Sequence, residues 1–205
     1  MTRGKPDGKR QRWKCVCAYD GTEFAGWQKQ PSGLAVQDKI EYALNEIFGQ
    51  AICTIGAGRT DAGVHAHGQV FHFDAPWPHA VDLLLEAMRC KFPVGISPRE
   101  LMQAEPHFHA LLSANGKRYR YRVCRGWAMP EDDRFVYSLR GRVVDAGLMS
   151  SGAEAFVGLH DFAAFSAKRG TDKNENTVRE VTKVEVLESK ENLDFVIEGG
   201  GFLYK

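Results

Sequence analysis

Residues 56–74, GAGRTDAGVHAHGQVFHFD, contain the side chains of this sequence that are best suited to chemistry. Glycines surround an Arg-Thr-Asp triplet, and three histidines follow it. Asp61 is the central carboxylate, and Arg59 precedes it by two residues. Such a segment can form a phosphate-binding loop, a metal site or a loop that presents a reactive carboxylate, and the spacing of the residues separates these three kinds of site.

A phosphate-binding loop is disfavoured by the spacing of the glycines. A dinucleotide-binding fingerprint needs a glycine three residues after Gly58, where this sequence has Asp61. A P-loop ends in Gly-Lys-Ser/Thr, which is absent from the segment. A carboxylate directed at a phosphate would also repel it, so the glycines need another explanation.

A metal site is the second possibility, because His65 and His67 could join Asp61 as nitrogen and oxygen ligands. A second His-x-His pair occurs at residues 107–109. No HExxH motif and no further acidic triad accompany these residues. A metal-dependent hydrolase built on Asp61, His65 and His67 therefore remains the less favoured alternative, and we expect no metal.

A reactive carboxylate is the third possibility. In an arbitrary Arg-x-Asp sequence, Asp61 would more often cap a turn or pair with Arg59. Here the flanking glycines allow a sharp turn and the close approach of a planar ligand. A nearby cation keeps a carboxylate ionised, as a nucleophile must be. This pattern favours a loop that presents Asp61 to a ligand.

Four segments in this order resemble the TruA family of tRNA pseudouridine synthases. They are YDGTEFAGWQKQP (19–31), GAGRTDAGVHAHGQVFHF (56–73), FHALLSANGKRYRYRV (108–123) and GLHDFAAFSA (158–167). The resemblance extends from about residue 13 to the last residue, and GRTDAGVHA is its most specific part. It implies an isomerase that converts uridine to pseudouridine.

The resemblance also implies roles for three residues. Asp61 matches the nucleophile that lets the uracil base leave its ribose, rotate and rejoin through carbon five. Arg59 matches an arginine that pairs with this carboxylate and helps to hold the nucleotide out of the helix. Tyr119 matches an aromatic residue that packs against the target base, whereas we expect Tyr121 to be a core residue. No metal, nucleotide or redox cofactor is implied.

The implied substrate is uridine at positions thirty-eight to forty in the anticodon stem-loop of tRNA, and the implied assembly is a homodimer. Recognition of RNA by shape and phosphate requires basic surface. The candidate cations for RNA contact are Lys29, Arg118, Arg120, Arg122, Arg125, Lys168 and Arg169.

The sequence departs from the family pattern at two places. Leu111 follows Phe-His-Ala, where an arginine is usual. The chain also stops before a hydrophobic helix and a Met-Val-Arg segment that family members carry. We therefore expect a truncated chain or a diverged member, and the alternative function is that of a catalytically impaired RNA-binding protein.

The patterns around these segments predict the elements that position them. In the first half, strands are expected at 12–20, 51–55 and 68–74, and helices at 35–49 and 81–92. In the second half, a strand follows the Asn-Gly turn at 115–116, Asp145 begins a helix that runs to Gly158, and paired strands occupy 178–188 and 193–199.

The composition is that of a globular protein, with 205 residues, 43% hydrophobic, 26% charged and a net charge of +1. No apolar run suits a membrane span or a signal peptide, so we expect a soluble, cytoplasmic protein. The expected organisation is a basic tail at 1–12, a subdomain with the Asp loop at 13–107 and a second, incomplete subdomain at 108–205. The expected fold class is α/β (α+β). The resemblance implies two ferredoxin/RRM-like halves that form one extended, mostly antiparallel sheet flanked by helices, with a cleft between the halves.

Overall fold

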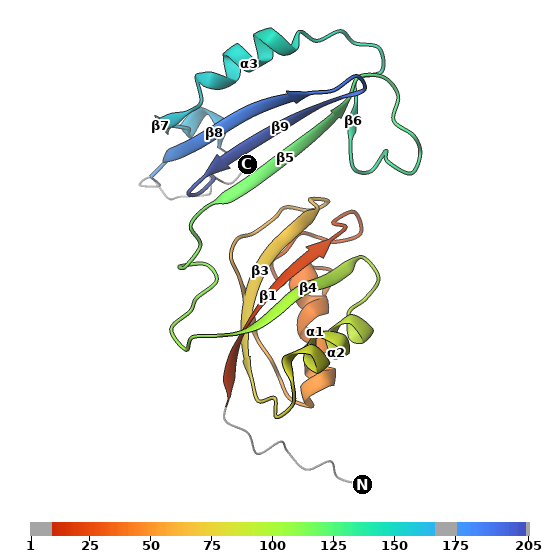
Figure 1. Ribbon diagram of the computed structural model, residues 1–205, viewed down its shortest axis with the longest axis vertical. Helices are drawn as coiled ribbons and strands as arrows, with labels where there is room; N and C mark the ends of the chain where they lie inside the picture. Colours follow the sequence, from red (N-terminus) through yellow and green to blue (C-terminus); the bar gives the residue numbers. More distant parts are fainter. Residues whose placement is uncertain (1–9, 167–175, 204–205) are drawn as a thin grey trace. The chain divides into compact units, whose positions relative to one another are not determined.

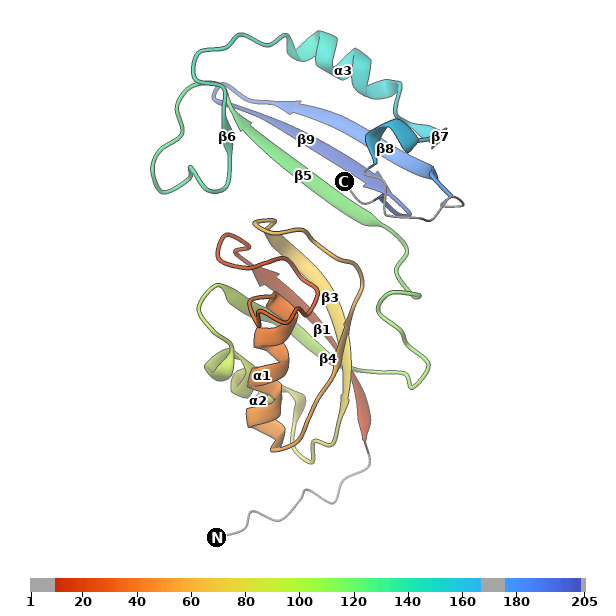
Figure 2. The ribbon, with the colours of Figure 1, turned by 180° about the vertical axis from the view of Figure 1, so that it is seen from behind.

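The computed structural model of the chain describes residues 10–166 and 176–203 (Figures 1 and 2). Its contacts divide the chain into two compact units, Met1–Ser113 and Ala114–Lys205. Each unit contains one β-sheet.

The first unit has the β-α-β-β-α-β order of a ferredoxin-like fold. Its elements are β1 (Gln11–Tyr19), α1 (Val36–Phe48), β2 (Thr54–Gly56), β3 (Ala66–Ala75), α2 (Val81–Lys91) and β4 (Ile96–Ala104). The strands pair antiparallel in the order β2-β3-β1-β4. Figure 2 shows α1 and α2 side by side on one face of this sheet. The loop that carries Asp61 joins β2 to β3.

The core of the first unit lies between this sheet and the two helices. Alternate residues of β1 are buried, from Trp13 to Tyr19, because successive side chains of a strand face opposite sides. Helix α1 adds Ile40 and Leu44, each 0% exposed, at the spacing of one helical face. Each large apolar side chain buried in this way contributes about 1.5–3 kcal/mol. The helix ends at Gly49, whose φ of 63° is left-handed.

Strand β4 completes the ferredoxin-like order but was not predicted from the sequence. Its buried residues are Ile96, Pro98 and Leu101, and this spacing breaks the simple alternation of a strand. The reason is a register shift in the pairing of β4 with β1, between Val16 and Cys17. A bulge of this kind adds one residue to one strand, so it hides the period of two.

The second unit contains a five-stranded sheet and one α-helix. Its elements are β5 (Lys117–Cys124), β6 (Tyr137–Ser138), α3 (Ala146–Glu154), β7 (Gly158–Asp161), a 3-10 turn (Ala163–Phe165), β8 (Val178–Glu188) and β9 (Asn192–Gly199). The strand order is β6-β5-β9-β8-β7, antiparallel except for the short β5–β6 pair. Helix α3 lies along one face of the sheet and contacts β8 (Figure 1). Val123, Leu139 and Leu193 form its small buried core.

The α+β class and the mostly antiparallel pairing are confirmed. The described strands form one sheet in each unit. After β4 the chain continues through turns and irregular backbone at 105–116 before β5 begins. None of the helices in the described residues is long and apolar enough to cross a membrane.

Two local predictions in the second unit have different outcomes. Asp145 does cap α3, since its carboxylate accepts a hydrogen bond from the Leu148 backbone N–H at 3.0 Å. The helix ends at Glu154, however, and Gly158 begins β7 with a φ of 113°. The prediction that Tyr121 is a core residue is wrong, because its side chain is 59% exposed. Only the end of β5, at Val123, reaches the buried core.

His72 of β3 links the sheet of the first unit to the Phe-His-Ala segment at 108–110. Its ring is 3% exposed, and its Nδ1 accepts a hydrogen bond from the Ala110 backbone N–H at 3.1 Å. Burial lowers the pKa of His72, and the charges of Arg12 and His109 lower it further, while Asp74 acts in the opposite direction. The neutral ring is therefore the form that the fold requires.

We expect the free energy of unfolding to fall as the pH drops from about 7.5 to 5.5, since the unfolded pKa of histidine is near 6.5. The folded pKa is lower, so this stabilisation is fully present above the unfolded pKa and is lost as the pH falls through the folded one. Denaturant unfolding of His72→Gln, whose amide oxygen still accepts but does not titrate, should show a smaller pH dependence. His109→Gln controls for the neighbouring ring, and an equal pH dependence in wild type and His72→Gln would contradict this assignment.

Candidate active site

Asp61 lies on the loop that joins β2 to β3, called here the Asp loop (57–65). The side chains of Arg59 and Asp61 are both exposed. Within the described residues, the Asp61 carboxylate forms no hydrogen bond or ion pair, although its backbone carbonyl accepts from the Val64 N–H at 3.2 Å. The loop therefore fixes the backbone of Asp61 and leaves its carboxylate open to solvent.

The Asp loop rests on the residues that follow β1, called here the support segment (20–30). The Trp27 N–H donates to the Thr60 carbonyl at 3.0 Å, and the Gly63 N–H donates to the Phe24 carbonyl at 3.4 Å. The hydroxyl of Tyr19, at the end of β1, lies 2.8 Å from the Thr60 hydroxyl. Thr60, which lies between Arg59 and Asp61 in the sequence, is thus held by both its backbone carbonyl and its side-chain hydroxyl.

Two glycines of the support segment permit this close contact. A Cβ atom on Gly21 would lie 2.1 Å from the Val64 carbonyl oxygen, and one on Gly26 would lie 2.6 Å from the Thr60 oxygen. Gly26 also has a φ of 89°, which L side chains rarely adopt. In both cases the obstructing atom is backbone, so any larger residue must displace the Asp loop.

The opposite flank of the Asp loop is attached to the sheet. The Ala57 N–H donates to the Val70 carbonyl at 2.7 Å, and the Gln69 amide donates to the Gly58 carbonyl at 2.8 Å. With the contacts of the support segment, these bonds brace the loop from both sides. This bracing is the part of the site that the sequence did not reveal. Its signal was the glycine pair in YDGTEFAGWQ.

Arg59 does not pair with Asp61 in this structure. No ion pair joins them among the described residues, although they are two positions apart on the same loop. Both charged groups therefore project from the Asp loop without neutralising each other.

The histidines near Asp61 are not arranged with other ligand side chains as a metal site would require, among the described residues. The Nδ1 atom of His65 accepts from the Gly21 N–H at 3.1 Å and lies 3.0 Å from the Asp20 carboxylate. The first contact requires an unprotonated Nδ1 and the second a protonated one, so the ring can satisfy only one at a time. His67 is exposed on β3. In residues 10–166 and 176–203, no three His, Cys, Asp or Glu side chains are arranged to hold a metal ion.

Tyr119 belongs to the second unit and lies on β5 opposite Ile197 of β9. Its side chain is 37% exposed, and its ring meets that of Phe202 edge-on with centroids 5.0 Å apart. The ring is therefore supported on one side while part of it remains accessible. Leu111, where the family usually has an arginine, is 49% exposed in the first unit.

Several of the predicted RNA-contacting cations already have carboxylate partners. Lys29 Nζ lies 2.9 Å from a carboxylate oxygen of the buried Glu41, which raises the pKa of Lys29. Arg118 pairs with Glu198 at 2.7 Å, and Arg120 pairs with Asp194. The other predicted cations divide into two groups. Arg122 and Arg125 lie near Asp194 and Glu188, whereas Lys168 and Arg169 fall outside the described residues.

Comparison with known proteins shows the family of this chain. Residues 153–205 match the family model described as tRNA pseudouridine synthase. The tRNA pseudouridine synthase A of Chlamydia felis is 38% identical over 93% of this chain and 71% of that protein. The protein of the same name from Limosilactobacillus fermentum is 40% identical over 94% of this chain and 76% of its own length. The chain belongs to the tRNA pseudouridine synthase A family.

Proposed function

We propose that this chain converts uridine to pseudouridine in tRNA, with the Asp61 carboxylate as the nucleophile. The observation that carries the proposal is the Asp loop, which is braced on both flanks and presents a carboxylate without a protein partner among the described residues. Family membership supports the reaction class and the tRNA substrate.

The reaction is an isomerisation, so its atoms balance without a further reactant. The bond between the ribose carbon and N1 of uracil breaks, the base rotates, and the ribose carbon bonds to carbon five. The hydrogen on carbon five leaves as a proton, and N1, which has lost its bond to the ribose, takes up a proton. Addition of Asp61 to the base and attack on the ribose carbon both require an ionised, exposed carboxylate. No oxidation state changes, and the proposal needs no cofactor.

Arg59 and Tyr119 have supporting roles in the proposal. A nucleotide inside a stem must leave its stack before the carboxylate can reach it, at a cost of a few kcal/mol. Stacking of a base on an aromatic ring contributes about 1–3 kcal/mol, so Tyr119 would offset much of this cost. Arg59 would hold the extruded nucleotide by its phosphate, since no protein carboxylate engages it among the described residues.

The proposed target is the anticodon stem-loop, at positions thirty-eight to forty, and the proposed active form is a cytoplasmic homodimer, both by family resemblance. Lys29, Arg118 and Arg120 would need to exchange a carboxylate for a phosphate in order to contact RNA. We therefore rank them below Arg59 as contacts.

Unmodified tRNA transcripts test the proposal. Pseudouridine should appear at positions thirty-eight to forty and should disappear from a transcript in which those uridines are replaced by cytidine. Product elsewhere would refute the assigned target. Salt-sensitive binding of tRNA without any product would refute the activity and favour an RNA-binding member of the family.

A further inference from the structure

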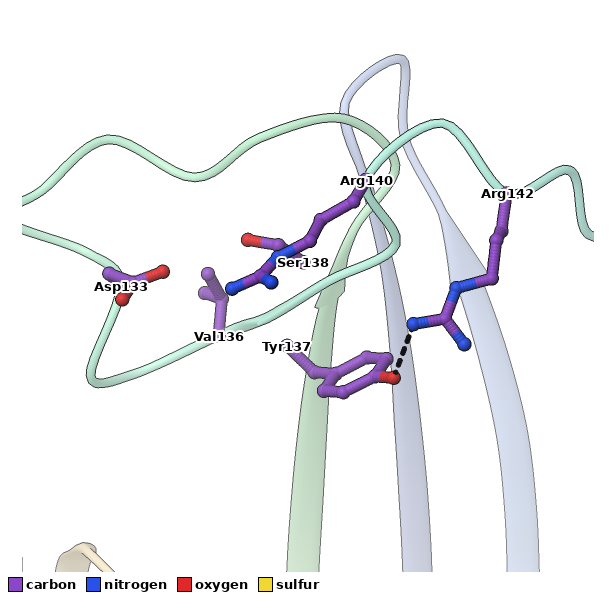
Figure 3. A pocket seen from close by; sticks show the side chains of 6 residues that line it. All are labelled: Asp133, Val136, Tyr137, Ser138, Arg140 and Arg142. Carbon is purple, nitrogen blue, oxygen red and sulfur yellow. Dashed lines mark hydrogen bonds between the residues drawn. The ribbon is translucent and has the colours of Figure 1, made fainter.

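A shallow pocket in the second unit lies on the connection between β5 and α3. It is called here the turn pocket, and it is lined by Asp133, Val136, Tyr137, Ser138, Arg140 and Arg142. Figure 3 shows the guanidinium of Arg142 beside the Tyr137 hydroxyl, to which it donates a hydrogen bond at 3.0 Å. Strand β6 provides the floor of this region through Tyr137 and Ser138.

The two arginines of the turn pocket are not neutralised by carboxylates. Among the described residues, neither forms an ion pair, and Asp133 on the far side of the pocket pairs with neither. The arginines of β5 differ, since Arg118 and Arg120 each have a carboxylate partner. Arg140 and Arg142 are therefore two neighbouring cations of this unit that no described carboxylate neutralises.

Aromatic rings hold both guanidinium groups in place. The Arg140 guanidinium carbon lies 5.2 Å from the centre of the Trp127 ring, and that of Arg142 lies 5.8 Å from the centre of the Tyr137 ring. Arg142 also donates to the Leu139 carbonyl at 3.3 Å. Trp127 is 73% exposed and Tyr137 44% exposed, so the rings support the cations and still offer open faces.

The backbone at Arg140 is strained. Its φ is 53°, and no other non-glycine residue in the described parts of the chain has a positive φ. Gly141 follows with a φ of 83°. Such a conformation costs a bulky residue about 1–3 kcal/mol and is otherwise taken by glycine or asparagine.

We propose that Arg140 and Arg142 bind phosphates of the RNA backbone, with Trp127 beside them as a stacking surface for an unpaired base. This inference rests on the proposed function for the identity of the RNA as tRNA. Guanidinium groups form paired hydrogen bonds to phosphate oxygens, and open aromatic faces accept bases of any sequence. The shallow pocket with Asp133 on one side suits an extended polyanion better than a small enclosed ion.

Binding of tRNA at several salt concentrations tests the proposal with the whole 205-residue chain. For Arg140→Gln/Arg142→Gln, the slope of log binding constant against log salt should decrease in magnitude by about 1.4–1.8, because each lost phosphate contact removes about 0.7–0.9. Trp127→Ala should weaken binding and leave this slope unchanged. Lys183→Gln is the matched control, since Lys183 is a cation of the same unit paired with Glu185 at 2.8 Å.

The outcomes separate this inference from the proposed function. A reduced slope in a chain that forms no pseudouridine would support the phosphate site and refute the activity. Normal pseudouridine formation, together with a slope in the double variant equal to that of Lys183→Gln, would overturn the phosphate site alone. Arg140→Gly removes the guanidinium and also relieves the backbone strain at this turn. Its thermal unfolding temperature, compared with that of wild type, shows whether the variant is folded. A folded Arg140→Gly chain should also bind tRNA with a reduced slope.

Discussion

Asp61→Asn is expected to lower pseudouridine formation by at least about a thousandfold while the chain remains folded and binds tRNA. The carboxylate has no protein partner among the described residues, so its loss should change stability by no more than about 0.5 kcal/mol. An amide is a poor nucleophile, and loss of a nucleophile removes most of the rate enhancement of an enzyme. Chromatography of digested tRNA measures the pseudouridine formed. Thermal unfolding measures the stability of the variant, and a binding assay measures its affinity for tRNA.

Two variants sharpen this prediction. Asp61→Glu keeps the charge and moves it by one methylene group, so it should retain a small part of the activity. Asp82→Asn makes the same chemical change on an exposed aspartate in the first turn of α2, and it should act like wild type. If Asp61→Asn and Asp82→Asn were equally active, Asp61 would not be the nucleophile.

Gly21→Ala is the second change with a large expected effect. Its Cβ atom would lie 2.1 Å from the Val64 carbonyl oxygen, where real Cβ contacts essentially never occur. The support segment and the Asp loop must then separate, which moves Asp61 by a large fraction of an ångström. A displacement of about 1 Å can cost about a hundredfold in rate. The free energy of unfolding should also fall by about 1–3 kcal/mol.

Gly68→Ala is the control for this substitution. Gly68 lies on β3, and an added Cβ would meet only a methyl group of Val16 at 3.8 Å, which is an ordinary contact. This variant should keep full activity and unfold at or above the wild-type temperature. Activity in Gly21→Ala that matched that of Gly68→Ala would show that the close contact with the Asp loop does not position Asp61.

The sequence predicted the elements whose patterns are regular. Helix α1 follows from the apolar spacing of Val36, Ile40 and Leu44, and β8 and β9 follow from their alternation. Strand β4 was not predicted because its bulge beside Val16 and Cys17 interrupts the alternation of buried and exposed residues. The burial of Tyr121 was predicted wrongly because one strand face can pass from the surface to the core within a few residues.

The candidate site was predictable where it depends on residue identity and not where it depends on contacts. Asp61 was found from its loop motif. The dependence of this loop on Gly21 and Gly26 could not be derived, because it arises between segments about 40 residues apart in the sequence. The same limit explains Lys29 and Arg118, which appear as free cations in the sequence and have carboxylate partners in the fold.

The most direct test of the central claim uses tRNA whose uridines carry tritium at carbon five. Formation of the new bond at this carbon displaces its hydrogen, so wild type should release tritium to water in proportion to the pseudouridine formed, and Asp61→Asn should release none above background. Bound tRNA that released no tritium with wild type, or undiminished release with Asp61→Asn, would contradict the account.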